Sequence, residues 1–252
     1  MPELLKSLFK QVLAKSDVAA KPLLSKVPAL PRVLNVGGGS REIGLTPHYN
    51  AWERHWLDID PRAKPDVLCD ARELASQPAA GYEAVYCSHN LEHYHHHEVQ
   101  RVLHGFLHVL KDDGFAHLRV PNIEQLLRMW YERKLDIDSE VATSARGPIR
   151  IRDILWGLSV EIEESGRDYY AHKTGFSPKT LTQALEDAGF AEVFLMTDGQ
   201  VIEISAIAFK RAGPNPFRSM FDIGSPAPDT PREKIDWSPG PSVSSSGSET
   251  SR

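Results

Sequence analysis

The chain has little of three features that define large classes of protein: cysteine, excess basic charge and long apolar runs. Its 252 residues include two cysteines, too few for a disulfide-stabilised secreted domain and typical of free thiols in a reducing cytosol. A net charge of −5 disfavours a general nucleic-acid binder, whose surface would be basic. No run is long enough to span a bilayer, and residues 1–15 lack the pattern of a signal peptide. We expect a cytoplasmic protein with no nucleic-acid partner; nothing in the sequence indicates an oligomeric state.

Composition divides the chain into three parts. Residues 1–31 hold leucines at helical spacing and then a proline-rich linker, which predicts an amphipathic helix packed on the domain, with contact to a membrane surface as the weaker alternative. Residues 32–212 form the predicted domain, in which residues 123–175 are a substrate-side insertion beside the strand ends. Residues 213–252, rich in Pro, Ser, Gly and Asp, predict a disordered tail. Three apolar residues of that tail are candidates for local docking: Phe217, Met220 and Phe221.

Alternating strand and helix patterns in the middle part predict an α/β domain with a mostly parallel, seven-stranded sheet. Five strands are expected before the insertion, at residues 33–36, 56–59, 66–69, 84–88 and 115–120. Helices are expected at residues 97–110, 123–133, 149–158 and 177–187. Gly114 is expected to end the first of these helices in a left-handed conformation. The β-rich runs on either side of Asp198-Gly199 predict an antiparallel hairpin at the end of the sheet.

Two neighbouring strand ends carry the residues that point to a ligand. The first strand runs into Gly37, Gly38 and Gly39, and glycine lets the backbone pass close to a bulky molecule. The second strand ends at Asp58, whose carboxylate can accept hydrogen bonds from a ribose diol. Because open α/β sheets bind ligands at the carboxyl ends of their strands, these residues predict a pocket for an adenosine-containing cofactor. A tight turn without a ligand is the alternative for the glycines, and Asp58 or Asp60 is expected to cap the turn at residue 61.

The glycine turn fits a dinucleotide fold poorly. Gly37 and Gly39 match the first two positions of Gly-x-Gly-x-x-Gly, but Glu42 occupies the third. A further acid, Asp70, follows the third strand, where it has two interpretations: a partner for the adenine amino group, or a cap on the turn at residues 71–75. The terminal hairpin also does not belong to a plain dinucleotide fold.

An ordered series of blocks resembles the class I S-adenosylmethionine-dependent methyltransferases, and the small "type 11" group most closely. The blocks cover about residues 32–210 and lie at residues 33–40, 58–60, 66–70, 88–93, 109–114, 175–177 and 188–190. The resemblance implies a three-layer Rossmann-like fold and methyl transfer from S-adenosylmethionine. It leaves the acceptor undefined, as a small molecule or a glycan- or lipid-linked precursor.

The resemblance also implies roles for individual residues. The glycines would lie under the methionine part of the cofactor, Asp58 would bind the ribose, and Ser88 and His89 would lie near the sulfonium methyl. Asp70 and Ala71 would flank the adenine. Two residues depart from the family pattern: Asn35 stands where an acid is usual, and Arg41 replaces a frequent glycine. These departures motivate a second hypothesis, a catalytically inactive cofactor-binding or scaffold protein.

Histidines are concentrated in one segment, where His89, His93 and His97 are spaced by four. Residues 89–94 are predicted to form a strand-to-helix loop, so helical spacing does not apply and no metal ligand is assigned. A metal-dependent enzyme or metal-handling protein is the third hypothesis, and it rests on these histidines. Histidine titrates near neutral pH and suits proton transfer from an acceptor, which makes His89 the first catalytic candidate and His172 the second. His93 is expected to hold the loop through backbone hydrogen bonds. Three tyrosines are candidates for the acceptor pocket or for ordinary packing: Tyr94, Tyr169 and Tyr170.

Overall fold

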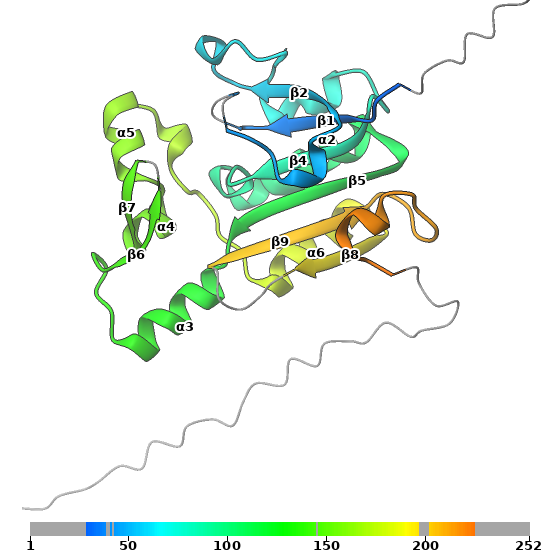
Figure 1. Cartoon of the computed structure of the whole chain (residues 1–252). Helices are drawn as coiled ribbons and strands as arrows, with labels where there is room; N and C mark the ends of the chain where they lie inside the picture. The colour runs from blue at the N-terminus through cyan, green and yellow to red at the C-terminus, as the bar shows by residue number, and fades with distance from the viewer. Residues whose placement is uncertain (1–28, 39–40, 42, 145, 197–201, 225–252) are drawn as a thin grey trace, which may run out of the picture.

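The computed structural model describes residues 29–38, 41, 43–144, 146–196 and 202–224 (Figure 1). The helix predicted at residues 1–15, Gly39 and the Asp198-Gly199 turn lie outside the described residues. Among the described residues, no helix is both long and apolar enough to cross a membrane.

The core of the fold is a seven-stranded sheet of order β3-β2-β1-β4-β5-β9-β8. Its strands are β1 (Arg32–Val36), β2 (Glu53–Asp58), β3 (Val67–Leu68), β4 (Tyr82–Ser88), β5 (Leu110–Pro121), β8 (Glu192–Met196) and β9 (Glu203–Phe209). The first five strands pair in parallel, and β9 pairs antiparallel with both β5 and β8. This topology confirms the predicted Rossmann-like methyltransferase fold with its antiparallel C-terminal hairpin.

The strand β5 begins earlier than expected, and Gly114 does not have the predicted role. The helix before it ends at Val109 with Leu110 already extended, and Gly114 does not have a positive φ. Instead, the pairing with β4 shifts register between Tyr82 and Ala84, which leaves residues 111–114 as a bulge. A Cβ at Gly114 would lie 2.9 Å from the Lys111 carbonyl oxygen, so glycine is needed there for close backbone approach.

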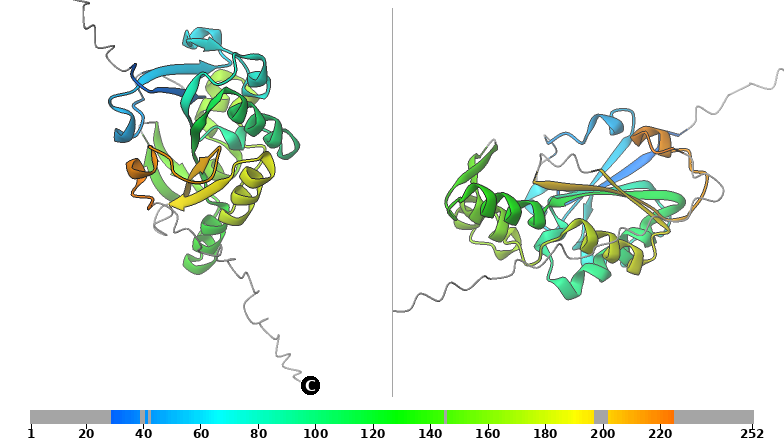
Figure 2. Two further views of the ribbon diagram at one scale, coloured as in Figure 1. Left: turned by 90° about the vertical axis from the view of Figure 1, so that its right-hand side faces the viewer. Right: turned by 90° about the horizontal axis from the view of Figure 1, so that it is seen from below.

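One face of the sheet is covered by the helices α2 (Val99–Val109) and α6 (Pro178–Ala188), with the 3₁₀ segment Ala71–Ser76 beside α2 (Figures 1 and 2). Alternate residues of the central strands meet the apolar stripe of α2 in the largest core cluster. The helix α6 starts as predicted, because the Ser177 side chain accepts a hydrogen bond from the Thr180 amide, and it ends at Gly189 in the left-handed region.

Within the described part of the chain, the opposite face is covered by loop residues and by residues 213–224. Tyr49, the last residue of the 3₁₀ segment Pro47–Tyr49, packs there with Trp52, Phe217 and Phe221. Phe221 belongs to the 3₁₀ segment Arg218–Phe221. The predicted start of a disordered tail at residue 213 is therefore too early, because these aromatic side chains find an apolar sheet face to cover. Residues 225–252 lie outside the described residues.

The insertion forms a small unit of its own beyond the carboxyl ends of β1, β2 and β4 (Figure 1). Its elements are α3 (Ile123–Arg133), β6 (Glu140–Ser144), β7 (Gly147–Arg150), α4 (Ile151–Trp156) and α5 (Ser159–Ser165). The strands β6 and β7 form an antiparallel hairpin, and a separate apolar cluster around Leu126 and Ile151 holds the unit together. The described residues also contain four further 3₁₀ segments: Pro61–Ala63, Leu91–His93, His96–Glu98 and Asp168–Tyr170.

Candidate functional site

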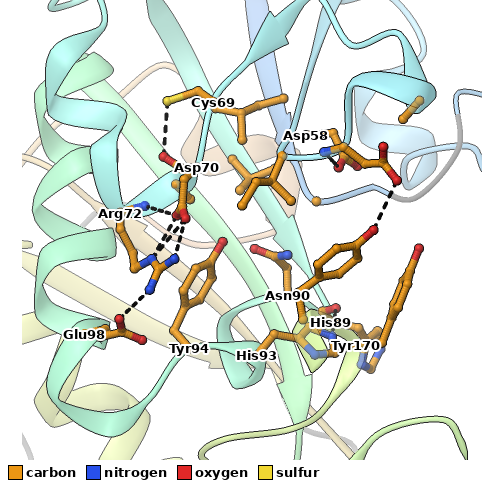
Figure 3. A pocket seen from close by; sticks show the side chains of 18 of the residues that line it. Asp58, Cys69, Asp70, Arg72, His89, Asn90, His93, Tyr94, Glu98 and Tyr170 are labelled. Atoms are coloured by element: carbon orange, nitrogen blue, oxygen red, sulfur yellow. Dashed lines mark hydrogen bonds and ion pairs between the residues drawn. The ribbon is translucent and has the colours of Figure 1, made fainter. Parts of the chain in front are cut away.

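A cavity of about 530 Å³ opens at the carboxyl ends of β1, β2 and β4. We call it the strand-end cavity, and its wall includes Gly37. Asp58, Asp70, Asn90 and Tyr94 also line it (Figure 3). Its volume lies in the range of small-molecule sites, about 300–1,000 Å³. The glycine turn and the acid of the second strand therefore meet at one cavity, as the sequence predicts.

The glycine turn leaves room for Asn90. Gly37 has a φ of +67°, and a Cβ built on it would lie 2.0 Å from the Asn90 side-chain nitrogen. A side chain at position 37 would thus collide with a residue of the cavity wall. The Asn90 Oδ1 atom is buried and has no hydrogen-bond partner within the described structure, so a donor on a bound molecule would satisfy it.

Two acids stand at the end of β2, Asp58 and Asp60, and the sequence left open which of them caps the following turn and which faces a ligand. Asp60 caps the 3₁₀ segment Pro61–Ala63 by accepting from the Arg62 amide, and it also accepts from Tyr169 Oη at 3.1 Å. Asp58 lies behind it and accepts the Asp60 amide at 2.8 Å on Oδ1. Burial raises the pKa of Asp58, although the Asp60 amide partly opposes that shift. Both acids line the cavity, but the Asp60 carboxylate is occupied by Arg62 and Tyr169, which leaves Asp58 as the acid available to a ligand.

The acid after β3 is a cap. Asp70 accepts the Arg72 amide at 2.9 Å and pairs with the Arg72 guanidinium, which also reaches Glu98 at 2.5 Å (Figure 3). Burial alone would raise the pKa of Asp70, but the hydrogen bonds from Arg72 hold it below its usual value. The capping alternative for Asp70 is thus observed, and its carboxylate is already occupied by Arg72.

A second cavity, of about 630 Å³, lies between the strand ends and the insertion. We call it the insertion cavity. Its lining is mostly apolar and includes Met129, Ile149, Ile154 and Leu158. Three acids at its wall are already bonded elsewhere: Asp153 to Ser159, Glu161 to Arg146, and Glu203 to Arg119. Three residues line both cavities: His89, His93 and Tyr170.

These three shared residues form what we call the junction, and beside it lies a buried carboxylate that the sequence analysis did not name as a site residue. Glu92 is 1% exposed, and neither of its carboxylate oxygens has a hydrogen-bond partner within the described structure. Imidazoles surround it: His89 Nδ1 lies 3.5 Å and His172 Nε2 lies 4.0 Å from Glu92 Oε1. Burial would raise the pKa of Glu92, but the histidines, His89 first, lower it overall, so the carboxyl group is ionised at neutral pH.

The two predicted catalytic histidines differ in charge. His89 has a φ of +48° and its Nε2 lies 2.9 Å from Glu203. Burial opposes the charge of His89, yet Glu203 and Glu92 raise its pKa to about 9, so it is protonated at neutral pH. Burial lowers the pKa of His172, whose Nδ1 donates to the Ile154 carbonyl at 2.8 Å. His172 is therefore neutral, with its lone pair on Nε2.

A family model described as a methyltransferase domain matches residues 2–193. The chain belongs to this family. The membership confirms the resemblance to class I methyltransferases, the assignment as an enzyme, and S-adenosylmethionine as the cofactor.

Solved structures similar to this methyltransferase include three bacterial or archaeal proteins. An S-adenosylmethionine-dependent methyltransferase from Archaeoglobus fulgidus is 18% identical, with a TM-score of 0.45 over 82% of this chain and 94% of that one. The PH0226 protein from Pyrococcus horikoshii is 12% identical, with a TM-score of 0.47 over 83% and 92%. A 1,6-didemethyltoxoflavin N1-methyltransferase from Burkholderia thailandensis is 15% identical, with a TM-score of 0.43 over 82% and 85%. Likenesses at this level do not identify an acceptor. A comparison with curated proteins finds no match.

The strand-end cavity fits the cofactor of a methyltransferase. Asp58 offers a carboxylate for a diol, and the orphaned Asn90 oxygen offers a second acceptor. Gly37 and Ala71 offer backbone and small surface along the wall. Tyr94 and Tyr169 add aromatic surface there, while Tyr170 faces both cavities.

Not every predicted site residue reaches a cavity. Neither described cavity is lined by Asn35, Gly38 or Ser88. Asn35 instead packs against the glycine turn. A Cβ built on Gly38 would lie only 2.2 Å from the Asn35 side-chain nitrogen. The expected loop-holding role of His93 is observed, since its two ring nitrogens each lie 3.2 Å from a backbone carbonyl oxygen. Glu92 was missed as a site residue although it stands in the Leu91-Glu92-His93 block.

Proposed function

We propose that this methyltransferase binds S-adenosylmethionine in the strand-end cavity and methylates a mostly apolar small molecule held in the insertion cavity. One observation supports this proposal above all others. The two cavities share a wall at His89, His93 and Tyr170, so a donor in one and an acceptor in the other meet there. Holding two reactants in contact accounts for much of the rate that such an enzyme supplies.

The cofactor is held in this proposal by groups that the structure leaves available. The Asp58 carboxylate accepts the ribose hydroxyls, and the backbone at Gly37 allows the rest of the molecule to pass close to β1. Asn90 accepts a donor on its orphaned oxygen. When bound, S-adenosylmethionine supplies a methyl group on a positively charged sulfur, the electrophile of the reaction.

The acceptor class follows from the insertion cavity. Its lining is mostly apolar, and two of its acids, Glu161 and Glu203, are paired with Arg146 and Arg119, so a cationic acceptor would find little free negative charge there. We propose a neutral, mostly apolar molecule that carries one oxygen or nitrogen nucleophile. The net charge of −5 favours such an acceptor over a nucleic acid.

An oxygen or nitrogen acceptor loses a proton during methyl transfer, and the histidines at the junction differ in their ability to assist. His89 is protonated at neutral pH, so it donates hydrogen bonds and positions the acceptor. His172 carries a lone pair on Nε2 and lies in the wall of the insertion cavity. We propose that His172, above the Glu92 carboxylate, activates the acceptor. A cytoplasmic location is also proposed, and the two free cysteines Cys69 and Cys87 support it.

The test uses two measurements. Isothermal titration with S-adenosylhomocysteine measures cofactor binding, and labelled S-adenosylmethionine with metabolite extracts identifies what gains a methyl group. We expect binding, a labelled apolar product, and a loss of product formation of about 100-fold in His172→Gln. His104→Gln, on the exposed side of α2, is the matched control with unchanged activity. Absence of S-adenosylhomocysteine binding at millimolar concentration would contradict the proposal.

A further inference from the structure

The carboxylate of Glu92 needs a cation that the described structure only partly provides. It is buried, and both of its oxygens lack a hydrogen bond within the described residues. Burying a carboxylate without a partner is strongly unfavourable, so such a group is usually found with a counter-ion or a metal. His89 approaches Oε1 at 3.5 Å, but its closer partner is Glu203, at 2.9 Å. Oε2 is left with no donor at all.

Two imidazoles lie beside this carboxylate, those of His93 and His172. His172 donates Nδ1–H to the Ile154 carbonyl, which leaves Nε2 unprotonated 4.0 Å from Glu92 Oε1. His93 lies with its ring 4.9 Å from that of His172. Each ring nitrogen of His93 lies 3.2 Å from a carbonyl oxygen, Nδ1 from that of Ala171 and Nε2 from that of His89, so coordination through one nitrogen would leave the other donating to its carbonyl. A histidine whose second nitrogen donates to a backbone carbonyl is the usual arrangement of a metal ligand.

We propose that Glu92, His93 and His172 bind one divalent first-row transition-metal ion of the zinc type in the wall between the two cavities. One ligand atom from each of the three residues lies within 4.8 Å of the others. Metal–ligand bonds of about 2.0–2.2 Å require only small rotations of the imidazole rings to close such a group around an ion. The fold brings together Glu92 and His93 with His172, which lies 79 positions after His93 in the sequence.

The ligand set selects the kind of metal. Two imidazole nitrogens and one carboxylate suit Zn²⁺, Co²⁺ or Mn²⁺, whereas Mg²⁺ prefers an octahedral set of oxygens. Three protein ligands also leave a coordination position open, and His93 and His172 both line the insertion cavity. An acceptor hydroxyl bound at that position would release its proton to water more readily, because the metal lowers its pKa, and the oxygen would then take the methyl group. This catalytic role rests on the proposed function, whereas metal binding itself does not. With the metal bound, His172 Nε2 would serve as its ligand, so the metal, in place of the free imidazole, would activate the acceptor.

The experiment measures metal binding on the full chain without a histidine tag. The exposed run His95-His96-His97 binds metal adventitiously, so His95→Gln/His97→Gln is the matched control. Protein stripped with chelator is titrated with Zn²⁺ and with Mg²⁺, and the Co²⁺ form is examined by visible absorption. We expect one Zn²⁺ per chain, an affinity at least about 100-fold lower in Glu92→Gln and in His172→Gln, and an unchanged affinity in the control.

The outcomes distinguish failure of the proposed metal site from failure of the proposed function. S-adenosylhomocysteine binding by each variant reports whether it is folded, and His172, partly exposed, is a milder site for substitution than the fully buried Glu92. Binding of S-adenosylhomocysteine without stoichiometric Zn²⁺ would overturn the metal site and leave the proposed function standing, with protonated His89 as the sole counter-ion of Glu92. Zn²⁺ that binds Glu92→Gln equally well would also overturn it. Stoichiometric Zn²⁺ without S-adenosylhomocysteine binding would sink the proposed function alone.

Discussion

The two cavities of this methyltransferase are built by different means. The strand-end cavity takes its walls from the ends of neighbouring parallel strands and the short turns that follow them. The insertion cavity takes most of its walls from α3, the β6–β7 hairpin and α4, which pack around a separate small core. The first is polar enough to recognise a cofactor through Asp58 and Asn90, whereas the second is mostly apolar.

This difference teaches which part of the function depends on the shared fold and which on the individual chain. Strand register fixes where the end of each parallel strand lies, and therefore where Asp58 and Gly37 meet. No such register constrains the insertion, whose cavity depends on how its own side chains pack. The variants below test whether the cofactor and acceptor sites can be damaged separately.

The largest effect is expected for Asp58→Ala. Removing the carboxylate deletes charge-assisted hydrogen bonds worth about 1.5–3 kcal/mol, so the affinity for S-adenosylhomocysteine should fall by about 100-fold. Asp112→Ala, at an exposed acid far from both cavities, is the control with unchanged affinity. Isothermal titration measures both, and equal affinities in the two variants would remove Asp58 from the cofactor site.

The next effect is on stability. Gly37→Ala places a side chain where φ is +67° and Asn90 already fills the space, so the free energy of unfolding should fall by about 2 kcal/mol. Gly44→Ala is the matched control, because nothing lies within 4 Å of its Cβ and its φ is not positive. Urea unfolding of the two variants gives the comparison. A Gly37→Ala protein as stable as its control would show that the turn relaxes without strain.

A smaller and more selective effect is expected in the insertion cavity. Ile149→Phe narrows that cavity, so kcat/KM for the identified acceptor should fall by about tenfold while S-adenosylhomocysteine affinity stays within twofold. Tyr131→Ser, at an exposed position of α3, is the control. If Ile149→Phe lowered cofactor affinity as much as acceptor turnover, the two cavities would not be separable.

The smallest effect is a pH dependence of cofactor binding. Burial raises the pKa of Asp58, and the ionised form is the one that accepts hydrogen bonds from the ribose. Lowering the pH should therefore weaken S-adenosylhomocysteine binding at a higher pH than an ordinary aspartate would cause, and raising the pH should restore it. Titrations across the acid range test this, and Asp58→Asn should bind weakly with no such dependence.

The sheet and half of the site could be predicted because their signals are local. The apolar run of β1, the glycine turn and the acid after β2 occur in short segments, and parallel pairing then brings the strand ends together. The sequence could not show whether Asp58 or Asp60 is the cap, because both acids come shortly before Pro61. In the structure the Asp60 side chain accepts the Arg62 amide, so Asp60 is the cap. Gly114 was misjudged for a similar reason, since a bulge and a helix cap both favour glycine.

The junction could not be predicted because its parts are distant in sequence. The charge of His89 depends on Glu203, which is 114 positions away, and the lone pair of His172 depends on a carbonyl in α4. The Leu91-Glu92-His93 block marked the segment without showing that the carboxylate turns inward. An acid next to histidines in a predicted strand-to-helix loop is the sequence signal that could have marked Glu92 as a candidate site residue.

The packing of residues 213–224 sets a limit on how far the protein can be shortened. Arg218 is 3% exposed, pairs with Glu192 at 2.6 Å and stacks over the ring of Phe194. It therefore holds residues 213–224 against the outermost strand, β8. A truncation at residue 212 would remove Phe217 and Phe221 from the face of β5 and β9. The apolar surface exposed there would favour aggregation. Shortened versions for crystallisation should keep the chain through residue 224.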